Sequence, residues 1–144
     1  MKKIVLSFLL TLGLVLGAGC ASGPGFAEAN ARIPALATGK GRVYFYRPST
    51  MGAAVRPEVR LDGKVVGKAV SHGYFYVDAA PGDHSVETTT EVERRLSFTL
   101  AKEQTRYVRL NISIGFAVGH VYPELVESGT GQNEIANCKY IGGE

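Results

Sequence analysis

Two neighbouring stretches of the sequence decide the fold class: residues 96–100, Leu-Ser-Phe-Thr-Leu, and residues 105–114, Thr-Arg-Tyr-Val-Arg-Leu-Asn-Ile-Ser-Ile. In the second stretch, large apolar side chains stand at every other position from Val108 to Ile114, with polar side chains between them. This period of two is typical of a β-strand with one face in a core and one face in water. Both stretches therefore predict strands, the first of them over residues 92–100, in a mainly β protein.

Further strands are predicted on both sides of this pair. They share β-branched and aromatic residues bounded by Gly, Pro or Asp, and they cover residues 42–47, 59–61, 64–66, 74–77, 84–90 and 117–126. Residues 42–47 and 74–77 are apolar on both faces, which indicates central strands. Asp62-Gly63 predicts a tight hairpin turn. The short connections 80–83 and 101–104 predict two more hairpins, each joining the strands on either side of it.

A short helix is predicted near the C-terminus, over residues 132–141. Ile135, Cys138 and Ile141 recur there with a spacing of three, which places Cys138 on the apolar face as a small buried side chain. The alternative is a thiol that forms an intermolecular disulfide or acts as a nucleophile. Only Lys139 supplies positive charge beside it, so burial is favoured. About seven short strands and one late helix together predict an antiparallel β-sandwich over residues 41–144.

The N-terminus has the composition of a secretory signal peptide. Lys2 and Lys3 precede an apolar run, residues 4–16, and three small residues then lead to Cys20. A membrane-spanning helix needs about 20 apolar residues, and this run has 13, so it is too short to remain as an anchor. Residues 1–19 are therefore predicted to be a signal peptide that is removed.

Residues 16–20, Leu-Gly-Ala-Gly-Cys, resemble the lipobox of bacterial lipoproteins. The resemblance implies that Cys20 is linked to diacylglycerol, becomes the first residue after cleavage and is then N-acylated, with palmitate as a typical acyl chain. Ala21, in place of Asp, implies by resemblance to Gram-negative lipoprotein sorting an outer-membrane anchor with the domain facing the periplasm. The alternative is an ordinary secretory signal followed by an accidental cysteine, which is disfavoured because cysteine is otherwise rare in the chain.

Cleavage before Cys20 would leave 125 residues, enough for one domain. Residues 20–40 are rich in Ala, Gly and Ser and predict a flexible tether, which would span roughly 25 Å and hold residues 41–144 clear of the lipid headgroups. Residues 33–36, Ile-Pro-Ala-Leu, offer an alternative in which part of this segment docks on the domain.

The charge balance argues against nucleic-acid binding. The formal net charge is +3, but Lys2 and Lys3 would leave with the signal peptide, and 14 Lys and Arg against 13 Asp and Glu would remain, a net charge of +1. The sequence contains no run of like charges. We therefore expect a membrane as one partner, through lipidated Cys20, and no nucleic acid.

A family resemblance is carried by four segments: residues 41–48 and 59–67, which contain the first predicted strand and the Asp-Gly hairpin, and residues 73–77 and 80–84, which contain a strand and a Pro-Gly turn. These segments resemble a family of small bacterial lipoproteins defined only as a domain of unknown function, and they also resemble PEGA-like modules. The resemblance covers most of residues 41–141 and implies a transthyretin-like β-sandwich. It implies no catalytic residue.

The candidates for metal or catalytic chemistry are three histidines, His72, His84 and His120. None has a second His, a Cys or a carboxylate at metal-ligand spacing in the sequence, so turn and surface positions are favoured over a metal or catalytic site. No Gly-x-Ser-x-Gly motif or phosphate-binding loop is present. We expect no metal, no cofactor and no enzymatic activity. An envelope enzyme built on the histidines is the less favoured alternative.

Four tyrosines form the candidate binding surface. Tyr44 and Tyr46 share one face of their strand, and Tyr74 and Tyr76 share one face of theirs, so neighbouring strands would gather four rings suited to glycan stacking or a protein contact. The alternative, that the rings pack beneath the N-terminal segment or the terminal helix, is favoured because large aromatic faces are usually buried. The sequence thus predicts a non-enzymatic envelope lipoprotein that binds an envelope protein or peptidoglycan, or supports the envelope, and a small-ligand or glycan carrier is the alternative.

Overall fold

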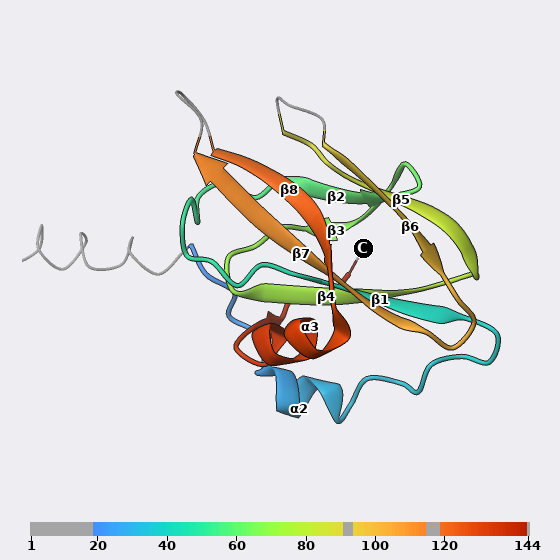
Figure 1. Ribbon diagram of the computed structural model, residues 1–144. Helices are drawn as coiled ribbons and strands as arrows, with labels where there is room; N and C mark the ends of the chain where they lie inside the picture. Colours follow the sequence, from blue (N-terminus) through green and yellow to red (C-terminus); the bar gives the residue numbers. More distant parts are fainter. Residues whose placement is uncertain (1–18, 91–93, 115–118, 144) are drawn as a thin grey trace, which may run out of the picture.

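The computed structural model of the chain describes residues 19–90, 94–114 and 119–143 (Figure 1). The predicted signal peptide, apart from Gly19, and the first two residues of the predicted strands 92–100 and 117–126 lie outside the described residues. Within the described ranges, no helix is both long and apolar enough to cross a membrane.

Two β-sheets pack face to face, and two short helices cover the outer face of one of them (Figure 1). The five-stranded sheet has the order β8-β7-β1-β4-β9, and the four-stranded sheet has the order β3-β2-β5-β6. The elements are α2 (Phe26–Asn30), β1 (Gly41–Tyr46), β2 (Glu58–Leu61), β3 (Lys64–Lys68), β4 (Gly73–Ala79), β5 (Gly82–Thr88), β6 (Arg95–Leu100), β7 (Thr105–Ile114), β8 (Gly119–Val126), α3 (Ser128–Ile135) and β9 (Lys139–Tyr140). The predicted mainly β sandwich with a short C-terminal helix is confirmed.

The predicted Asp-Gly hairpin is present between β2 and β3. Leu61 pairs with Lys64, and Asp62 and Gly63 have φ angles of 52° and 80°. Positive φ at both central residues is the requirement of a type I′ turn, whose twist matches that of the flanking strands.

The other two predicted hairpins are wrong. β4 pairs with β1 and β9, whereas β5 pairs with β2 and β6, so the turn between β4 and β5 carries the chain from one sheet to the other. The connection 101–104 does the same between β6 and β7, because β7 pairs with β1 and β8. An alternating strand pattern shows which face is buried, but it does not show which neighbour receives the backbone hydrogen bonds.

The five-stranded sheet is mixed rather than wholly antiparallel. β1 runs parallel to β7, and β4 runs parallel to β9. The parallel β1–β7 pair arises because the chain leaves the five-stranded sheet after β4, builds β5 and β6 in the opposite sheet, and returns to the free side of β1. A long excursion of this kind is what a parallel connection requires.

Strand β1 is central, as its apolar composition predicts, and all six of its residues are buried. Val43 and Phe45 lie in the core between the sheets, and Tyr44 and Tyr46 lie in a second cluster on the opposite face. Figure 1 shows α2 and α3 on that opposite face, away from the four-stranded sheet. The molecule therefore has a second, smaller core outside the sandwich, and this core contains the candidate tyrosines.

The C-terminal helix begins and ends earlier than predicted. It covers Ser128–Ile135 instead of residues 132–141, and Lys139 and Tyr140 form a short strand beside β4. The backbone N–H of Lys139 donates to His72 and that of Ile141 donates to Tyr74, so these groups take sheet partners in place of helical ones. Cys138 is buried, as predicted, with 1% of its surface exposed.

Candidate functional site

Six tyrosine rings gather on the outer face of the five-stranded sheet. The strand register explains the four that the sequence predicts, because Tyr44 lies opposite Tyr76 and Tyr46 lies opposite Tyr74 across the β1–β4 pair. The other two, Tyr107 on β7 and Tyr140 on β9, complete the cluster. The predicted convergence of Tyr44, Tyr46, Tyr74 and Tyr76 on one face is therefore observed.

Three of the four predicted rings are covered. Tyr46 and Tyr74 have no exposed surface, and Tyr44 is 6% exposed. The Tyr46 hydroxyl donates a hydrogen bond to Glu134 Oε2 of α3 at 2.6 Å. Burial, together with the nearby Glu134 carboxylate, raises the pKa of Tyr46. Three of the four rings thus pack beneath the N-terminal segment and α3, which is the arrangement that the sequence favours over an open patch, whereas Tyr76 is half-buried.

The segment that covers the rings is residues 20–40, here called the strap. The structure differs at this point from the flexible tether predicted for these residues. Phe26, Ala29 and Ile33 form one apolar face, and they pack against the tyrosine cluster. The Phe26 ring lies 5.3 Å from the Tyr74 ring, centroid to centroid. These three residues recur with helical spacing, so the strap carries a short amphipathic pattern within its Ala- and Gly-rich composition.

Hydrogen bonds hold the strap on both sides of α2. Ala21 N–H donates to Ser71 O at 2.9 Å, and Tyr140 N–H donates to Pro24 O at 2.9 Å. After the helix, Arg42 Nη2 donates to Pro34 O at 2.9 Å. The strap is therefore joined to the domain by directional bonds as well as by apolar packing.

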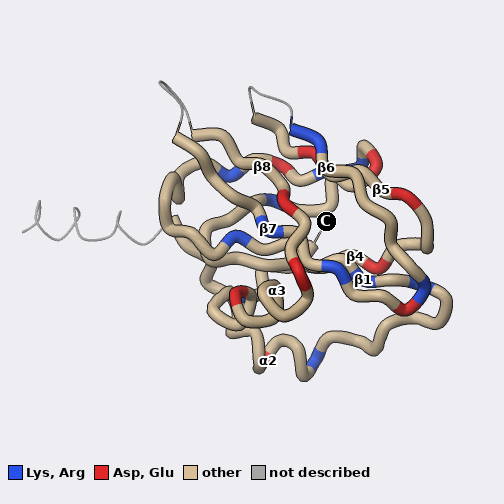
Figure 2. Tube along the Cα trace, in the orientation of Figure 1, with Lys and Arg blue, Asp and Glu red and all other residues tan. Residues whose placement is uncertain are grey.

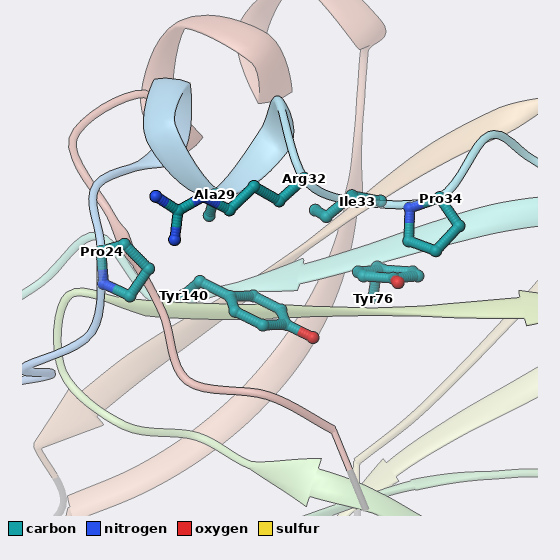
Figure 3. Close-up of a pocket in the computed structure, with 7 residues that line it drawn as sticks. All are labelled: Pro24, Ala29, Arg32, Ile33, Pro34, Tyr76 and Tyr140. Atoms are coloured by element: carbon teal, nitrogen blue, oxygen red, sulfur yellow. The ribbon is translucent and has the colours of Figure 1, made fainter.

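A pocket of about 280 Å³ remains between the strap and the sheet (Figure 3). Figure 3 shows the rings of Tyr76 and Tyr140 as its floor, with strap residues opposite them. The full lining is Pro24, Ala29, Arg32, Ile33, Pro34, Tyr76 and Tyr140. Of the four predicted tyrosines, Tyr76 is the one that lines this pocket.

The pocket combines an aromatic floor with cationic neighbours. The rings of Tyr76 and Tyr140 are stacked, with centroids 6.2 Å apart and planes 25° apart. The Arg42 guanidinium lies 4.3 Å from the centroid of Tyr76, and it also donates to both oxygens of Asp78 at 2.6 and 2.8 Å. The hydrogen bond to Asp78 raises the pKa of Arg42. Arg32 stands at the rim, with 76% of its side chain exposed. Such a pocket suits a ring that stacks on tyrosine and carries polar or anionic substituents.

The three histidines lie apart in the fold, His72 in the turn before β4, His84 on β5 and His120 on β8. His84 on β5 is the best-connected of them, because its Nδ1 lies 2.7 Å from Asp62 Oδ2 and its Nε2 lies 2.7 Å from Ala80 O. Burial lowers the pKa of His84, but these hydrogen bonds outweigh burial and the pKa is raised. His72 Nε2 lies 3.1 Å from Thr50 Oγ1, and His120 pairs with Ser113 at the start of β8. Across residues 19–90, 94–114 and 119–143, no group of three His, Cys, Asp or Glu side chains could hold a metal ion.

The two cysteines differ in exposure. Cys20 is exposed at the start of the strap, and its sulfur lies 3.9 Å from Ser71 Oγ. Cys138 is buried against the tyrosine cluster, and burial, with a smaller effect of the Glu134 carboxylate, raises its pKa to about 12. Cys138 therefore behaves as an unreactive buried thiol at neutral pH. Cys20 is the cysteine that a modifying enzyme could reach.

Sequence reasoning missed Tyr107, Tyr140 and the pocket-lining residues of the strap. The tyrosines were missed because the neighbours of β1 and β4 could not be assigned from the sequence. A signal for the strap was present in the spacing of Phe26, Ala29 and Ile33, but it is short and lies in a segment whose composition is typical of linkers.

Comparisons with known proteins identify a family for the chain and supply no activity. An uncharacterized protein of Haemophilus influenzae is 26% identical over 99 residues, which cover 68% of this chain and 59% of the relative. The chain thus spans about three-fifths of the length of that relative. No solved structure matches the chain. The model of a protein family of unknown function, DUF2846, matches residues 37–121, from just before β1 to the start of β8, and the chain belongs to this family.

Proposed function

We propose that the protein is a lipid-anchored cell-envelope protein whose domain serves as a non-enzymatic binding or structural module. The observation that carries the proposal is the position of Cys20. It follows a signal-like sequence and a lipobox-like motif, and it is exposed where the folded domain begins, whereas Cys138 is buried. One acyl chain gives only marginal membrane binding, and the chains on a lipoprotein cysteine together give a stable anchor. Ala21 supports an outer-membrane location facing the periplasm.

The test compares two cysteine variants in cells. Cys20→Ser should move the protein from the membrane fraction to the soluble fraction, because it removes the thioether sulfur. Cys138→Ser is the matched control and should leave the protein in the membrane fraction. Mass spectrometry of the mature N-terminal peptide should find a diacylglyceryl and an acyl group on Cys20. An unmodified N-terminus, or a Cys20→Ser variant that stays with the membrane, would contradict the proposal.

A second candidate function is the binding of a small ligand or glycan, and the pocket over Tyr76 and Tyr140 favours it. Peptidoglycan fragments are the first probe, because their sugar rings stack on aromatic side chains and their carboxylates would meet Arg32. Tyr140→Leu should weaken binding about tenfold or more, and Tyr122→Leu, on β8, should leave it unchanged. If titration calorimetry shows no binding at millimolar fragment concentrations, the glycan role fails. Crosslinking in intact cells would then be used to find a protein partner.

A further inference from the structure

We propose that the end of the sandwich that carries Cys20 rests directly on the lipid bilayer, so that the domain has a fixed orientation on the membrane. The inference rests on the proposed lipid attachment at Cys20. The partner surface is a phospholipid bilayer. The contact consists of the loop between β1 and β2, residues 48–56, and the end of β7.

The lipid attachment point lies directly against the folded domain. Ala21 is 8% exposed, and its N–H donates to Ser71 O at 2.9 Å, so the residue next to the lipidated cysteine already belongs to the folded body. A flexible tether of 20 residues would allow roughly 25 Å between lipid and domain. One residue allows about 3.8 Å. The acyl chains would therefore enter the bilayer at the surface of the domain itself.

Loop 48–56 lies beside the attachment point. Ser71, which holds Ala21, donates its hydroxyl to Ser49 O at 2.7 Å. A Cβ placed on Gly19 would lie 3.1 Å from Cβ of Ala53. Residues 48–55 contain no charged side chain, and Met51 is 51% exposed. Figure 2 shows the uncharged part of this loop, residues 48–55, at the end where the N-terminal chain meets the domain.

The end of β7 continues the same surface. The backbone of Gly52 approaches the Ile112 side chain so closely that a Cβ there would overlap it. Two residues further on, Ile114 is 72% exposed. In the described part of the chain, Met51 and Ile114 are the exposed large hydrophobic residues, and both lie at the Cys20 end. A lipid-facing surface requires exposed apolar side chains near the lipid attachment point, and these two residues supply them.

The loop is held in place by a buried arginine. Arg47 has no exposed surface, and its guanidinium donates to the carbonyl oxygens of Val55 at 2.6 Å, Ala69 at 2.9 Å, Met51 at 2.6 Å and Gly52 at 2.9 Å. Three of these four oxygens belong to the loop. The loop conformation that presents Met51 is thus formed before any contact with lipid, which reduces the entropy cost of that contact.

An arginine follows the uncharged residues 48–55 of the loop. Arg56 is exposed and lines the hollow around Cys20 together with Ser22 and Tyr140. An uncharged surface with a guanidinium beside it suits a bilayer surface, because the acyl chains lie just below the anionic phosphates. Arg56 would reach phosphate oxygens while Met51 and Ile114 contact the upper acyl region.

The test measures lipid contact at two positions on the lipidated protein. A fluorescent label is attached to Met51→Cys or, as the control, to Lys102→Cys in the exposed turn before β7. Lys102 is about 30 Å from the Ile114 end, because β7 has 10 residues and a strand rises about 3.3 Å per residue. Cys138 is 1% exposed, so the label goes to the new cysteine. On phosphatidylethanolamine–phosphatidylglycerol vesicles with nitroxide lipids, the label at 51 should be quenched severalfold more than the label at 102. Equal quenching at both positions, or more at 102, would overturn the inference.

A second pair of variants tests the role of the strap. Gly23→Ala should release the strap, since a Cβ there would overlap the carbonyl oxygen of Tyr140, whereas a Cβ on Gly25 meets no atom within 4 Å. In the Met51→Cys background, Gly23→Ala should reduce the quenching towards the value at 102, and Gly25→Ala should leave it unchanged. Unchanged quenching in both would show that docking does not orient the domain. The mass of the N-terminal peptide is checked in every sample: a protein without lipid on Cys20 refutes both proposals, and a lipidated protein without position-dependent quenching refutes this inference alone.

Discussion

The change of Gly23 to alanine adds one methyl group where the strap passes closest to the domain. Its Cβ would overlap the carbonyl oxygen of Tyr140 and lie 2.8 Å from the carbonyl carbon. The Tyr140 backbone cannot easily yield, because β9 pairs with β4, and the N–H groups of Lys139 and Ile141 donate to His72 O and Tyr74 O. The strap must therefore move away from the sheet around residue 23.

The size of the effect follows from what this movement breaks. The hydrogen bonds from Ala21 N–H to Ser71 O and from Tyr140 N–H to Pro24 O lie on either side of Gly23. Each is worth about 1 kcal/mol net, so their loss alone lowers the free energy of unfolding by about 2 kcal/mol. If α2 also leaves the tyrosines, the partly buried ring of Phe26 loses its packing, which adds on the order of 1–2 kcal/mol. For a domain of this size, about 2 kcal/mol corresponds to a fall in Tm of roughly 5–10 °C.

Thermal and urea unfolding of the chain from residue 20, with Cys20→Ser in every variant, would measure this loss. Gly25→Ala is the matched control. Gly25 has φ −64° and ψ 163°, which alanine adopts readily, and nothing lies within 4 Å of an added Cβ. The control should stay within about 0.5 kcal/mol of the parent. Hydrogen exchange should accelerate at residues 21–33 in Gly23→Ala alone. If the two variants are equally stable, the strap does not dock as described.

Three further changes probe the rest of the fold. Gly131→Ala should lower the free energy of unfolding, measured by urea unfolding, by about 2–3 kcal/mol, because its Cβ would overlap the Tyr107 ring. Gly129→Ala is the control and should have no such effect, since its Cβ meets nothing within 4 Å. Equal losses of stability in the two variants would contradict the packing of α3. Arg47→Met should lower the free energy of unfolding by about 3 kcal/mol, because four carbonyl oxygens lose their hydrogen-bond donor. Hydrogen exchange should also increase in the loop after β1. An unchanged exchange rate in that loop would refute the role of Arg47 in holding it. His84→Gln should lower the free energy of unfolding by about 1 kcal/mol at pH 5.5 and by less at pH 9. Because the pKa of His84 is raised in the folded state, its contribution to stability is complete below about pH 6.5 and is lost as the pH rises through the folded-state pKa. A loss of stability that did not change with pH would exclude a charged pair with Asp62.

The sequence was most informative where one pattern had one structural meaning. The run 42–47 is apolar at successive positions, and a strand with this pattern has to be covered on both faces, so a central place for β1 followed directly. The tyrosines of β1 and β4 alternate with Val43, Phe45 and Phe75, so their common face could be predicted once the two strands were neighbours. The burial of Cys138 followed from its apolar neighbours even though the helix boundary was wrong.

Strand pairing was less predictable, because a short turn joins two strands in one sheet or in opposite sheets with similar residues. Pro81-Gly82 and residues 101–104 both have the composition of a hairpin turn, and both carry the chain across the sandwich. What decides between the outcomes is which inward faces interlock, for instance Phe98 and Val86 in one sheet against Val108 in the other. This information is spread over residues distant in sequence, and no local window contains it.

The strap shows why composition alone could not separate a tether from a docked segment. Glycine and alanine are frequent in flexible linkers because they restrict the backbone little, and they are equally suited to close packing because they occupy little space. Gly23 is needed where the strap touches the Tyr140 carbonyl, and Ala29 of α2 is 4% exposed. The same residue types therefore pack closely here and form flexible linkers in other proteins. The difference lies in the sheet face against which this segment packs. If Cys20 is lipidated, this difference also changes what the segment does. A flexible tether would hold the domain away from the membrane, whereas a docked strap would bring the Cys20 end of the sandwich against the bilayer.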